Sequence, residues 1–156
     1  MKIAMTEAES ILGRALQARA IADAADIAWA TVWLEACGYT GFKFLGEALA
    51  DERQTLDLTR DVLGIDLDNV SCAFLAPAIM REVAANGRAF LRNVRHGLFM
   101  LPFTVKANMG IGCPIDPSFA VGGERHKNPY AEKLAEAQAQ GLDIDDAVWS
   151  AIPGLS

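Results

Sequence analysis

Metal-binding and nucleophilic side chains are scarce in this chain, because its 156 residues include three cysteines and two histidines. Cys37, Cys72 and Cys113 are widely separated and odd in number, so they do not form a disulfide framework, and no Cys-x-x-Cys pair suggests zinc. This use of cysteine fits a reducing cytoplasm. We therefore expect a cytoplasmic protein with no metal site and no cofactor, and the sequence identifies no catalytic residue.

Positive charge and long apolar runs are also limited. Fourteen lysines and arginines stand against 20 acids, for a net charge of −6, whereas a nucleic-acid binder normally carries a basic stripe. No run approaches the roughly 18 apolar residues that cross a bilayer, and the first residues, MKIAMTEAE, lack the apolar core of a signal peptide. We expect neither nucleic acid nor membrane as the partner.

Apolar residues, in contrast, are abundant at 52%, a little above the usual range for soluble domains. Much of the excess is alanine, the best helix former, so helices are expected to pack closely. The length predicts a single domain over 1–156. Spare apolar surface predicts a homo-oligomer or a complex with another protein subunit.

Helical spacing of apolar residues recurs in several segments. Thr6 and Glu9 fit a capping box, Gly38 fits a left-handed stop residue, Gly141 closes a helix, and Pro129 fits the first position of that helix. The predicted helices span about 7–20, 23–37, 42–50, 77–85 and 129–140, with a last helix that starts from Asp143 or Asp145 and runs to Ile152. Residues 51–69 are predicted as a loop with one helical turn, and 70–75 as a short strand or the beginning of a helix.

Strands are predicted in the second half of the chain. The segment from Arg88 to Asn108 contains six consecutive apolar residues, Leu98 to Phe103, after a His-Gly pair that can turn the chain. It predicts two strands, at about 89–94 and 98–106, with Pro102 at an edge or a bulge. Two more are expected around 110–113 and 118–121, joined by a turn at Asp116-Pro117. The predicted fold is α+β, with N- and C-terminal helices packed around a small antiparallel sheet.

One basic cluster stands out: Arg88, Arg92, Arg95 and His96. Arginine forks suit carboxylate or phosphate recognition, and the period of two puts Arg88 and Arg92 on one face of a strand. The alternative is that these charges protect a strand against edge-to-edge pairing.

Gly110 to Cys113 is the second candidate, since two glycines can form a backbone nest for an anion beside a thiol. The alternative is that the glycines shape a tight strand around an inert cysteine. Elsewhere, Glu124 and His126 supply too few ligands for a metal, and the aspartates between 57 and 68 lack the spacing of a calcium loop.

Trp29 and Trp33 lie four residues apart in the most apolar predicted helix, where seven alanines occur between Ala20 and Ala36. A tryptophan pair at this spacing is typical of a core or of a subunit interface, and a ligand pocket is the third alternative. We treat both as interface candidates. Asp26, in the same helix, is interpreted as an acid near the positive end of the helix dipole rather than as a buried carboxylate.

These patterns resemble a family of uncharacterised bacterial proteins. The resemblance rests on T-E-A-E, on W-L-x-x-x-G-x-x-G from Trp33 to Gly41, on V-S-C…A-P from Val70 to Pro77, on N-V-x-x-x-L-x-x-L-P-F from Asn93 to Phe103, and on G-L-D-I-D…W from Gly141 to Trp149. The outer segments are also similar to type-2 malate/lactate dehydrogenases, whose C-terminal G-E…G-I…W pattern fits Gly123-Glu124 and Gly141 to Trp149. That family's Asp-Ser-His-Gly motif falls where this chain has Gly-Tyr-Thr-Gly, Gly38 to Gly41, and its nicotinamide-binding middle does not fit in 156 residues. The resemblance therefore implies a dehydrogenase-like chain without the chemistry.

Two functions follow as expectations. The first is a small protein that acts by association, as a homo-oligomer or as a companion subunit. The second is a small organic-acid binder, or a minimal or vestigial oxidoreductase-like enzyme, with the cluster of Arg88, Arg92, Arg95 and His96 facing Gly110 to Cys113. A cavity lined by the arginines favours the second, whereas an apolar surface that carries the tryptophans favours the first.

Overall fold

The computed structural model describes residues 1–113, 118–125 and 127–155. The chain divides into two compact units: unit 1 comprises Met1–Asp51 and Pro129–Ser156, and unit 2 comprises Glu52–Asn128. Helices and a sheet are both present, so the α+β class is confirmed. The single domain over 1–156 stays a prediction, because two packing units can still unfold together.

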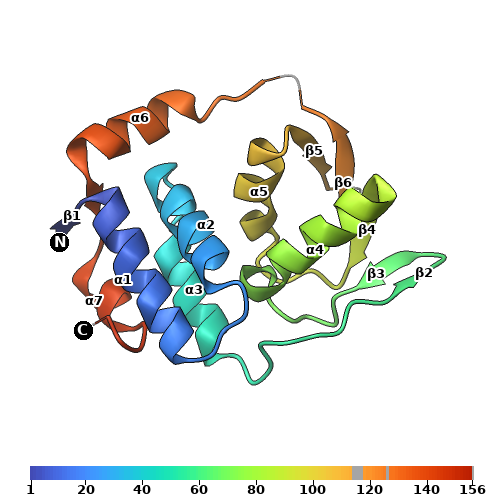
Figure 1. Ribbon diagram of the computed structural model, residues 1–156, viewed down its shortest axis with the longest axis horizontal. Coiled ribbons are helices and arrows are strands. Elements are labelled where there is room, and N and C mark those ends of the chain that lie inside the picture. The colour runs from blue at the N-terminus through green and yellow to red at the C-terminus, as the bar shows by residue number, and fades with distance from the viewer. Residues whose placement is uncertain (114–117, 126, 156) are drawn as a thin grey trace. The chain divides into compact units, whose positions relative to one another are not determined.

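Unit 1 is built from helices of both chain ends, as Figure 1 shows. Its N-terminal half supplies α1 (Met5–Ala18), α2 (Ala24–Ala36) and α3 (Gly41–Ala50), and its C-terminal half supplies α6 (Ala131–Gln140) and α7 (Asp146–Ser150). A short antiparallel pair, β1 (Lys2–Ile3) and β7 (Leu142–Asp143), joins the two halves.

The core of unit 1 forms around α2, which packs against α1, α3 and α6. Small residues permit the close contacts: a Cβ on Gly13 of α1 would lie 3.8 Å from the Ala28 methyl, and one on Gly41 would overlap the Thr31 carbonyl oxygen. Gly41 is therefore required where α3 begins against α2. The alanine-rich sequence of α2 explains why it accepts neighbours on several sides.

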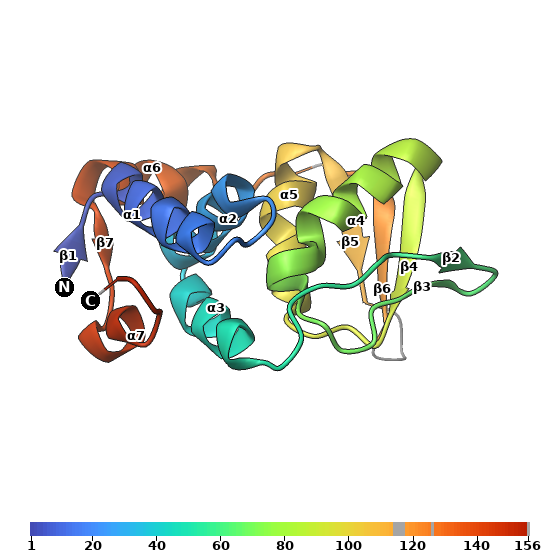
Figure 2. The same cartoon turned by 60° about the horizontal axis from the view of Figure 1, so that its bottom comes forward.

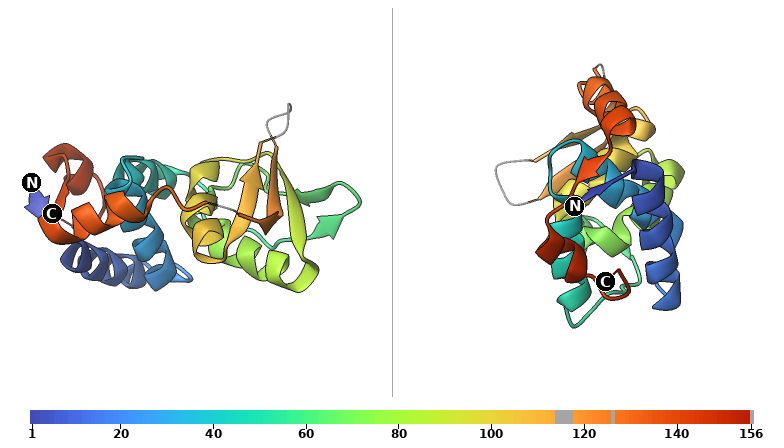
Figure 3. Two further views of the ribbon diagram at one scale, coloured as in Figure 1. Left: turned by 90° about the horizontal axis from the view of Figure 1, so that it is seen from above. Right: turned by 90° about the vertical axis from the view of Figure 1, so that its left-hand side faces the viewer.

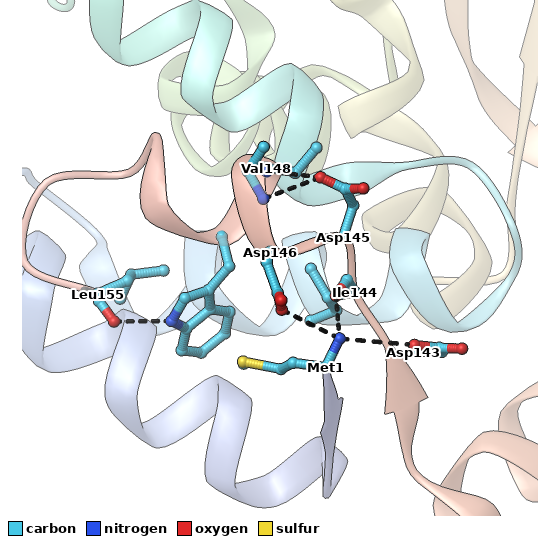
Figure 4. Close-up of polar contacts among 9 residues, drawn as sticks. Met1, Asp143, Ile144, Asp145, Asp146, Val148 and Leu155 are labelled. Carbon is cyan, nitrogen blue, oxygen red and sulfur yellow. Dashed lines mark hydrogen bonds and ion pairs between the residues drawn. The ribbon is translucent and has the colours of Figure 1, made fainter.

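At the ends of the helices in unit 1, one prediction from the sequence is wrong and three are confirmed. Because α1 begins at Met5, Thr6 lies inside it, and no side chain caps this helix, so the predicted capping box is wrong. Gly38 (φ +84°) and Gly141 (φ +82°) follow α2 and α6 with a positive φ, and both helices end where expected. Asp145 caps α7 by accepting hydrogen bonds from the N–H groups of Ala147 and Val148 (Figure 4). Helix α6 begins two residues later than predicted, at Ala131.

The N-terminal amine is held beside α7 (Figure 4). It donates a hydrogen bond of 2.6 Å to the Ile144 carbonyl and lies 3.2 Å from the Asp146 carboxylate and 3.7 Å from that of Asp143. The Trp149 indole N–H donates to the Leu155 carbonyl at 2.7 Å. These contacts fasten both ends of the described chain to the same short helix.

Glu35 links α2 to α3 because its carboxylate accepts a hydrogen bond of 3.0 Å from the Phe42 N–H, at the start of α3. Burial raises the pKa of Glu35, although the N–H groups of Phe42 and Gly41 oppose this shift. The folded state therefore holds the proton more tightly than the unfolded chain does.

From this shift we expect Glu35→Gln to change the pH dependence of stability. The raised pKa makes the Glu35 contribution fully present below pH of about 4.5 and lost as the pH rises through the folded pKa. The stability of the wild type relative to Glu35→Gln should fall over that window, as followed by urea unfolding at several pH values. Glu7→Gln, at an exposed position of α1, controls for the loss of charge. A difference that rises with pH would contradict this assignment.

Unit 2 contains a five-stranded sheet in the order β2-β3-β4-β6-β5. Its strands are β2 (Arg60–Asp61), β3 (Gly64–Asp66), β4 (Arg88–Arg92), β5 (Met109–Gly112) and β6 (Phe119–Glu124). The β3–β4 pair is parallel and the others are antiparallel, so the sheet is mixed rather than purely antiparallel as predicted. The β5–β6 pair was expected, and its predicted turn at 116–117 lies outside the described residues.

The predicted loop holds over 51–59, but the rest of the segment contains β2 and β3, where the prediction is wrong. Aspartates shape the turns there: the Leu63 N–H donates to the Asp61 carboxylate at 2.8 Å, and the Asp68 N–H donates to that of Asp66 at 2.9 Å. Short polar residues of this kind stabilise turns through their own backbone neighbours. The resulting hairpin projects from unit 2 in Figures 1 and 3.

Two helices, α4 (Cys72–Asn86) and α5 (Met100–Lys106), lie on one side of the sheet in Figures 2 and 3. The alternate residues Ala89 and Leu91 of β4 and Val121 of β6 are buried on that side. Helix α4 starts at Cys72 rather than at Pro77, because Ser71 supplies the cap by accepting a hydrogen bond of 3.1 Å from the Ala73 N–H. We call the opposite side of β4, β6 and β5 the open face, since neither α4 nor α5 covers it.

The strand predicted at 98–106 is wrong. This segment forms a 3₁₀ turn, η1 (Gly97–Phe99), followed by α5. Four consecutive residues, Phe99 to Pro102, are buried, which a strand with one solvent face does not allow but a helix against the core does. Pro102 fits because it is the third residue of α5, where its missing N–H has no partner within the helix.

Candidate functional site

The basic cluster that the sequence singled out is dispersed by the fold. Arg88 and Arg92 share the open face of β4, as the period of two predicts, whereas Arg95 and His96 lie in the following loop. Arg92 is bound to Asp61 by an ion pair of 2.8 Å, and its Nε is buried with no hydrogen-bond partner among the described residues. Of the four, Arg88 alone lines a cavity of about 710 Å³ on this face.

His96 has a positive φ of 54° and lies before η1. Its Nδ1 is 2.7 Å from the Ser71 hydroxyl, which also accepts the Ala73 N–H. Ser71 is completely buried, so this serine–histidine pair fastens the 93–97 loop to the start of α4 and presents no accessible nucleophile. His126, the other histidine, lies outside the described residues.

The cysteines differ in exposure. Cys37 and Cys72 are buried, and burial raises the pKa of Cys37 to about 11 and that of Cys72 to about 12. Both are therefore protonated thiols at neutral pH, which makes them poor nucleophiles. Cys113 is exposed and follows Gly112 at the end of β5.

The two tryptophans have separate environments. Trp33 is 5% exposed and packs on Tyr130, with ring centroids 4.9 Å apart. Trp29 is partly exposed, one turn earlier on α2. The structure therefore places Trp33 in the core of unit 1, and the interface role of Trp29 stays a prediction.

A cavity of about 710 Å³ lies on the open face of unit 2. Its lining comes from three neighbouring strands, β4, β6 and β5, and from no residue within α4 or α5. The residues whose side chains, or missing side chains, shape it are Arg88, Phe90, Gly110, Gly112, Ala120 and Gly122. Arg88 and Gly110 to Gly112 thus line one cavity, as the binding hypothesis proposed.

Strand register gives this cavity its form. Arg88 lies opposite Gly122, which lies opposite Gly110, and Phe90 lies opposite Ala120, which lies opposite Gly112. Each cross-strand row therefore begins with a large side chain on β4 and continues over two positions with a methyl group or nothing. The result is a wall of Arg88 and Phe90 beside a bare floor.

Gly122 is required where it stands. Its φ is +142°, and a Cβ there would lie 2.8 Å from both the Arg88 Cβ and the Gly87 carbonyl oxygen. Gly112 is different, because a Cβ there meets nothing within 4 Å. At Gly122 the neighbouring backbone therefore excludes any side chain, whereas at Gly112 there is room for one.

Both wall side chains face solvent. Phe90 is 39% exposed, which is unusual for a phenylalanine in the middle of a sheet. Arg88 is also exposed, and none of the ion pairs among the described residues involves it. A guanidinium beside an apolar floor is an arrangement that holds a carboxylate attached to an apolar body.

Phe90, Ala120 and Gly122 also line the cavity, and none of them was among the site residues predicted from the sequence. The alternation in R-A-F-L-R puts Phe90 on the same face as Arg88, and this signal was available. The contribution of β6 was not, because its register against β4 follows from tertiary pairing.

The rest of the described structure limits the chemistry. No three potential metal ligands among histidine, cysteine and acidic residues gather within residues 1–113, 118–125 and 127–155. None of the helices in those residues combines the length and apolar character needed to cross a bilayer. A smaller cavity in unit 1, about 350 Å³, has a mixed lining that includes Glu35, Lys133 and Glu136. Comparison with protein-family models, curated proteins and solved structures finds no match to this chain.

Proposed function

We propose that this protein binds a small organic acid on the open face of unit 2, with Arg88 as the partner of the carboxylate. The observation that carries the proposal is the single cavity that combines Arg88, Phe90 and the bare floor. Its volume of about 710 Å³ lies in the range of small-molecule sites, which are mostly apolar with a few polar groups that fix orientation.

The lining favours binding over catalysis. Arg88 is the one ionisable side chain among the described residues that line the cavity. General acid–base catalysis needs a group that accepts or gives a proton near the reacting atoms, and arginine stays charged. The proposal is therefore a binding protein, such as a carrier or a sensor, rather than the minimal or vestigial oxidoreductase-like enzyme that the resemblance suggests.

Association is the second candidate, and the hairpin of β2 and β3 favours it. At its tip the side chain of Val62 is 100% exposed and that of Leu63 is 62% exposed. Neighbouring exposed apolar side chains often mark a contact surface. Under this alternative a second copy of the chain covers the tip, and Val62→Asp should shift the mass measured by light scattering from dimer to monomer. A wild-type monomer at high concentration would contradict it.

A cytoplasmic location and kinship with the uncharacterised bacterial family are part of the same proposal. Protonated, buried thiols at Cys37 and Cys72 fit a reducing compartment. The dehydrogenase-like outer segments lie mostly in unit 1, whereas their Gly123-Glu124 pair lies on β6, in the same unit as the proposed site.

We expect Arg88→Gln to weaken carboxylate binding by about 10- to 100-fold, since a hydrogen bond to a charged group contributes about 1.5–3 kcal/mol. The measurement is isothermal titration calorimetry with 2-naphthoate as the probe acid. Arg92→Gln is the matched control, because it removes the same charge from the same strand face outside the cavity. Equal loss in both variants, or no binding to the wild type, would sink the proposal.

A further inference from the structure

The dimensions of the floor follow from the strand register. Gly122 and Gly110 form one pair and Ala120 and Gly112 form the next pair on the same face. Neighbouring strands lie about 4.8 Å apart, and residues on one face recur about every 6.8 Å along a strand. The floor thus has the footprint of a fused two-ring system, and no side chain larger than a methyl group rises from it.

A flat floor selects for flat ligands. Dispersion attraction falls steeply once atoms separate beyond contact distance. A planar ring brings all its atoms to that distance above the two strands at once, whereas a puckered ring holds part of its atoms away. The bare backbone at Gly110 and Gly122 permits this close approach.

The two wall side chains, Arg88 and Phe90, orient a ligand that lies on the floor. Phe90 is the cross-strand partner of Ala120, and aromatic rings in contact prefer edge-to-face or offset arrangements. Arg88 stands beside Gly122, in the next row of the same face. A ring on the floor therefore meets the Phe90 ring with one part and has its acid group near the guanidinium.

We propose that the ligand is a planar, fused-ring aromatic acid that lies flat on the floor of Gly110, Gly112, Ala120 and Gly122. This inference rests on the proposed function and narrows it from organic acids in general to one shape. The acid group binds Arg88, and the ring contacts Phe90 and the backbone of β5 and β6. Aliphatic acids of equal size make the same ion pair and lose the contact with the floor.

Three probes of matched size test the shape of the ligand by calorimetry on the full chain: 2-naphthoate, decahydro-2-naphthoate and 2-naphthol. The first is planar and charged, the second is charged and puckered, and the third is planar and uncharged. We expect 2-naphthoate to bind at least tenfold more tightly than each of the other two. The saturated acid is the more hydrophobic of the two acids, so binding driven by hydrophobicity alone would favour the saturated acid instead.

A blocking variant tests the location. Gly112→Leu sends a side chain over the floor from a position where a Cβ meets nothing, so the fold should keep its circular dichroism spectrum and melting temperature. We expect it to abolish 2-naphthoate binding, and Gly112→Ala, which adds one methyl group, to weaken binding less than tenfold.

The outcomes separate the two proposals. If neither acid binds, the proposed function itself is wrong. Should both acids bind with equal affinity and both lose it in Arg88→Gln, the function stands and the planar ligand is overturned. Binding of 2-naphthoate that survives Gly112→Leu would place the ligand elsewhere and overturn this inference as well.

Discussion

Replacing Gly64 by alanine is expected to lower the free energy of unfolding by more than about 2 kcal/mol, because positive-φ strain of about 1–3 kcal/mol adds to overpacking of about 1–3 kcal/mol. Gly64 begins β3 with φ +108°, and a Cβ there would overlap the Phe90 carbonyl oxygen. Because β3 pairs with β4, the added methyl group pushes β3 away from β4, the strand that holds both Phe90 and Arg92. Urea unfolding followed by far-ultraviolet circular dichroism measures the loss.

Two other glycines divide the effect into its causes. Gly87 has φ +81° but open space around a Cβ, so Gly87→Ala should show the strain alone, about 1 kcal/mol. Gly112 has open space without a positive φ, and Gly112→Ala should change stability by less than about 0.5 kcal/mol. Equal losses at Gly64 and Gly87 would show that the contact with Phe90 is not as tight as described.

Truncating Phe99 to alanine is expected to cost about 3–5 kcal/mol, the range for a fully buried phenylalanine. Phe99 is completely buried where η1 meets α5, and the neighbouring Met100 and Pro102 are buried too. Chemical unfolding of purified protein measures the change. If Phe99→Ala unfolds the chain outright, Phe99→Leu gives a measurable, smaller loss.

Leu98→Ala serves as the control, because Leu98 is only partly buried. We expect it to cost less than half of the Phe99→Ala loss. In the strand that the sequence suggested, Phe99 and Met100 would point to opposite faces, and truncating one of them would cost much less. A small effect at both Phe99 and Met100 would therefore contradict the helix.

Local signals in the sequence predicted much of this fold. Gly38 and Gly141 follow helices because glycine accepts a positive φ, and Asp145 caps α7 through its own carboxylate. A strand was predicted at about 89–94, where β4 spans Arg88–Arg92, and the period of two put Arg88 and Arg92 on one of its faces. These successes depend on residues within one turn or one strand of each other.

Elements whose conformation depends on contacts with residues far along the chain were predicted wrongly. The apolar run from Leu98 to Phe103 fits a buried strand or a buried helix equally well, and packing against α4 and β5 selects the helix. Ser71 caps α4, so the helix begins at Cys72, and Pro77 lies inside the helix five residues after its start. Local sequence rules do not predict a proline inside a helix, where tertiary contacts allow it.

The candidate site shows the same division. Arg88 and the glycines at 110 and 112 were identified from their own chemistry, and the structure brings them to one cavity. Phe90 and Ala120 became part of it through the register of β6 between β4 and β5. Arg92 does not line the cavity and is instead paired with Asp61, which comes from a segment interpreted as a loop.

The most direct test of this account is a two-dimensional NMR titration of the isotopically labelled protein with 2-naphthoate. Backbone N–H signals of glycines fall in a distinct region of the spectrum, so Gly110, Gly112 and Gly122 report on the floor individually. We predict that these three signals and that of Phe90 shift together with one saturating affinity, and that the helices of unit 1 do not respond. Shifts confined to unit 1, or none at saturating probe, would contradict a binding site on the open face.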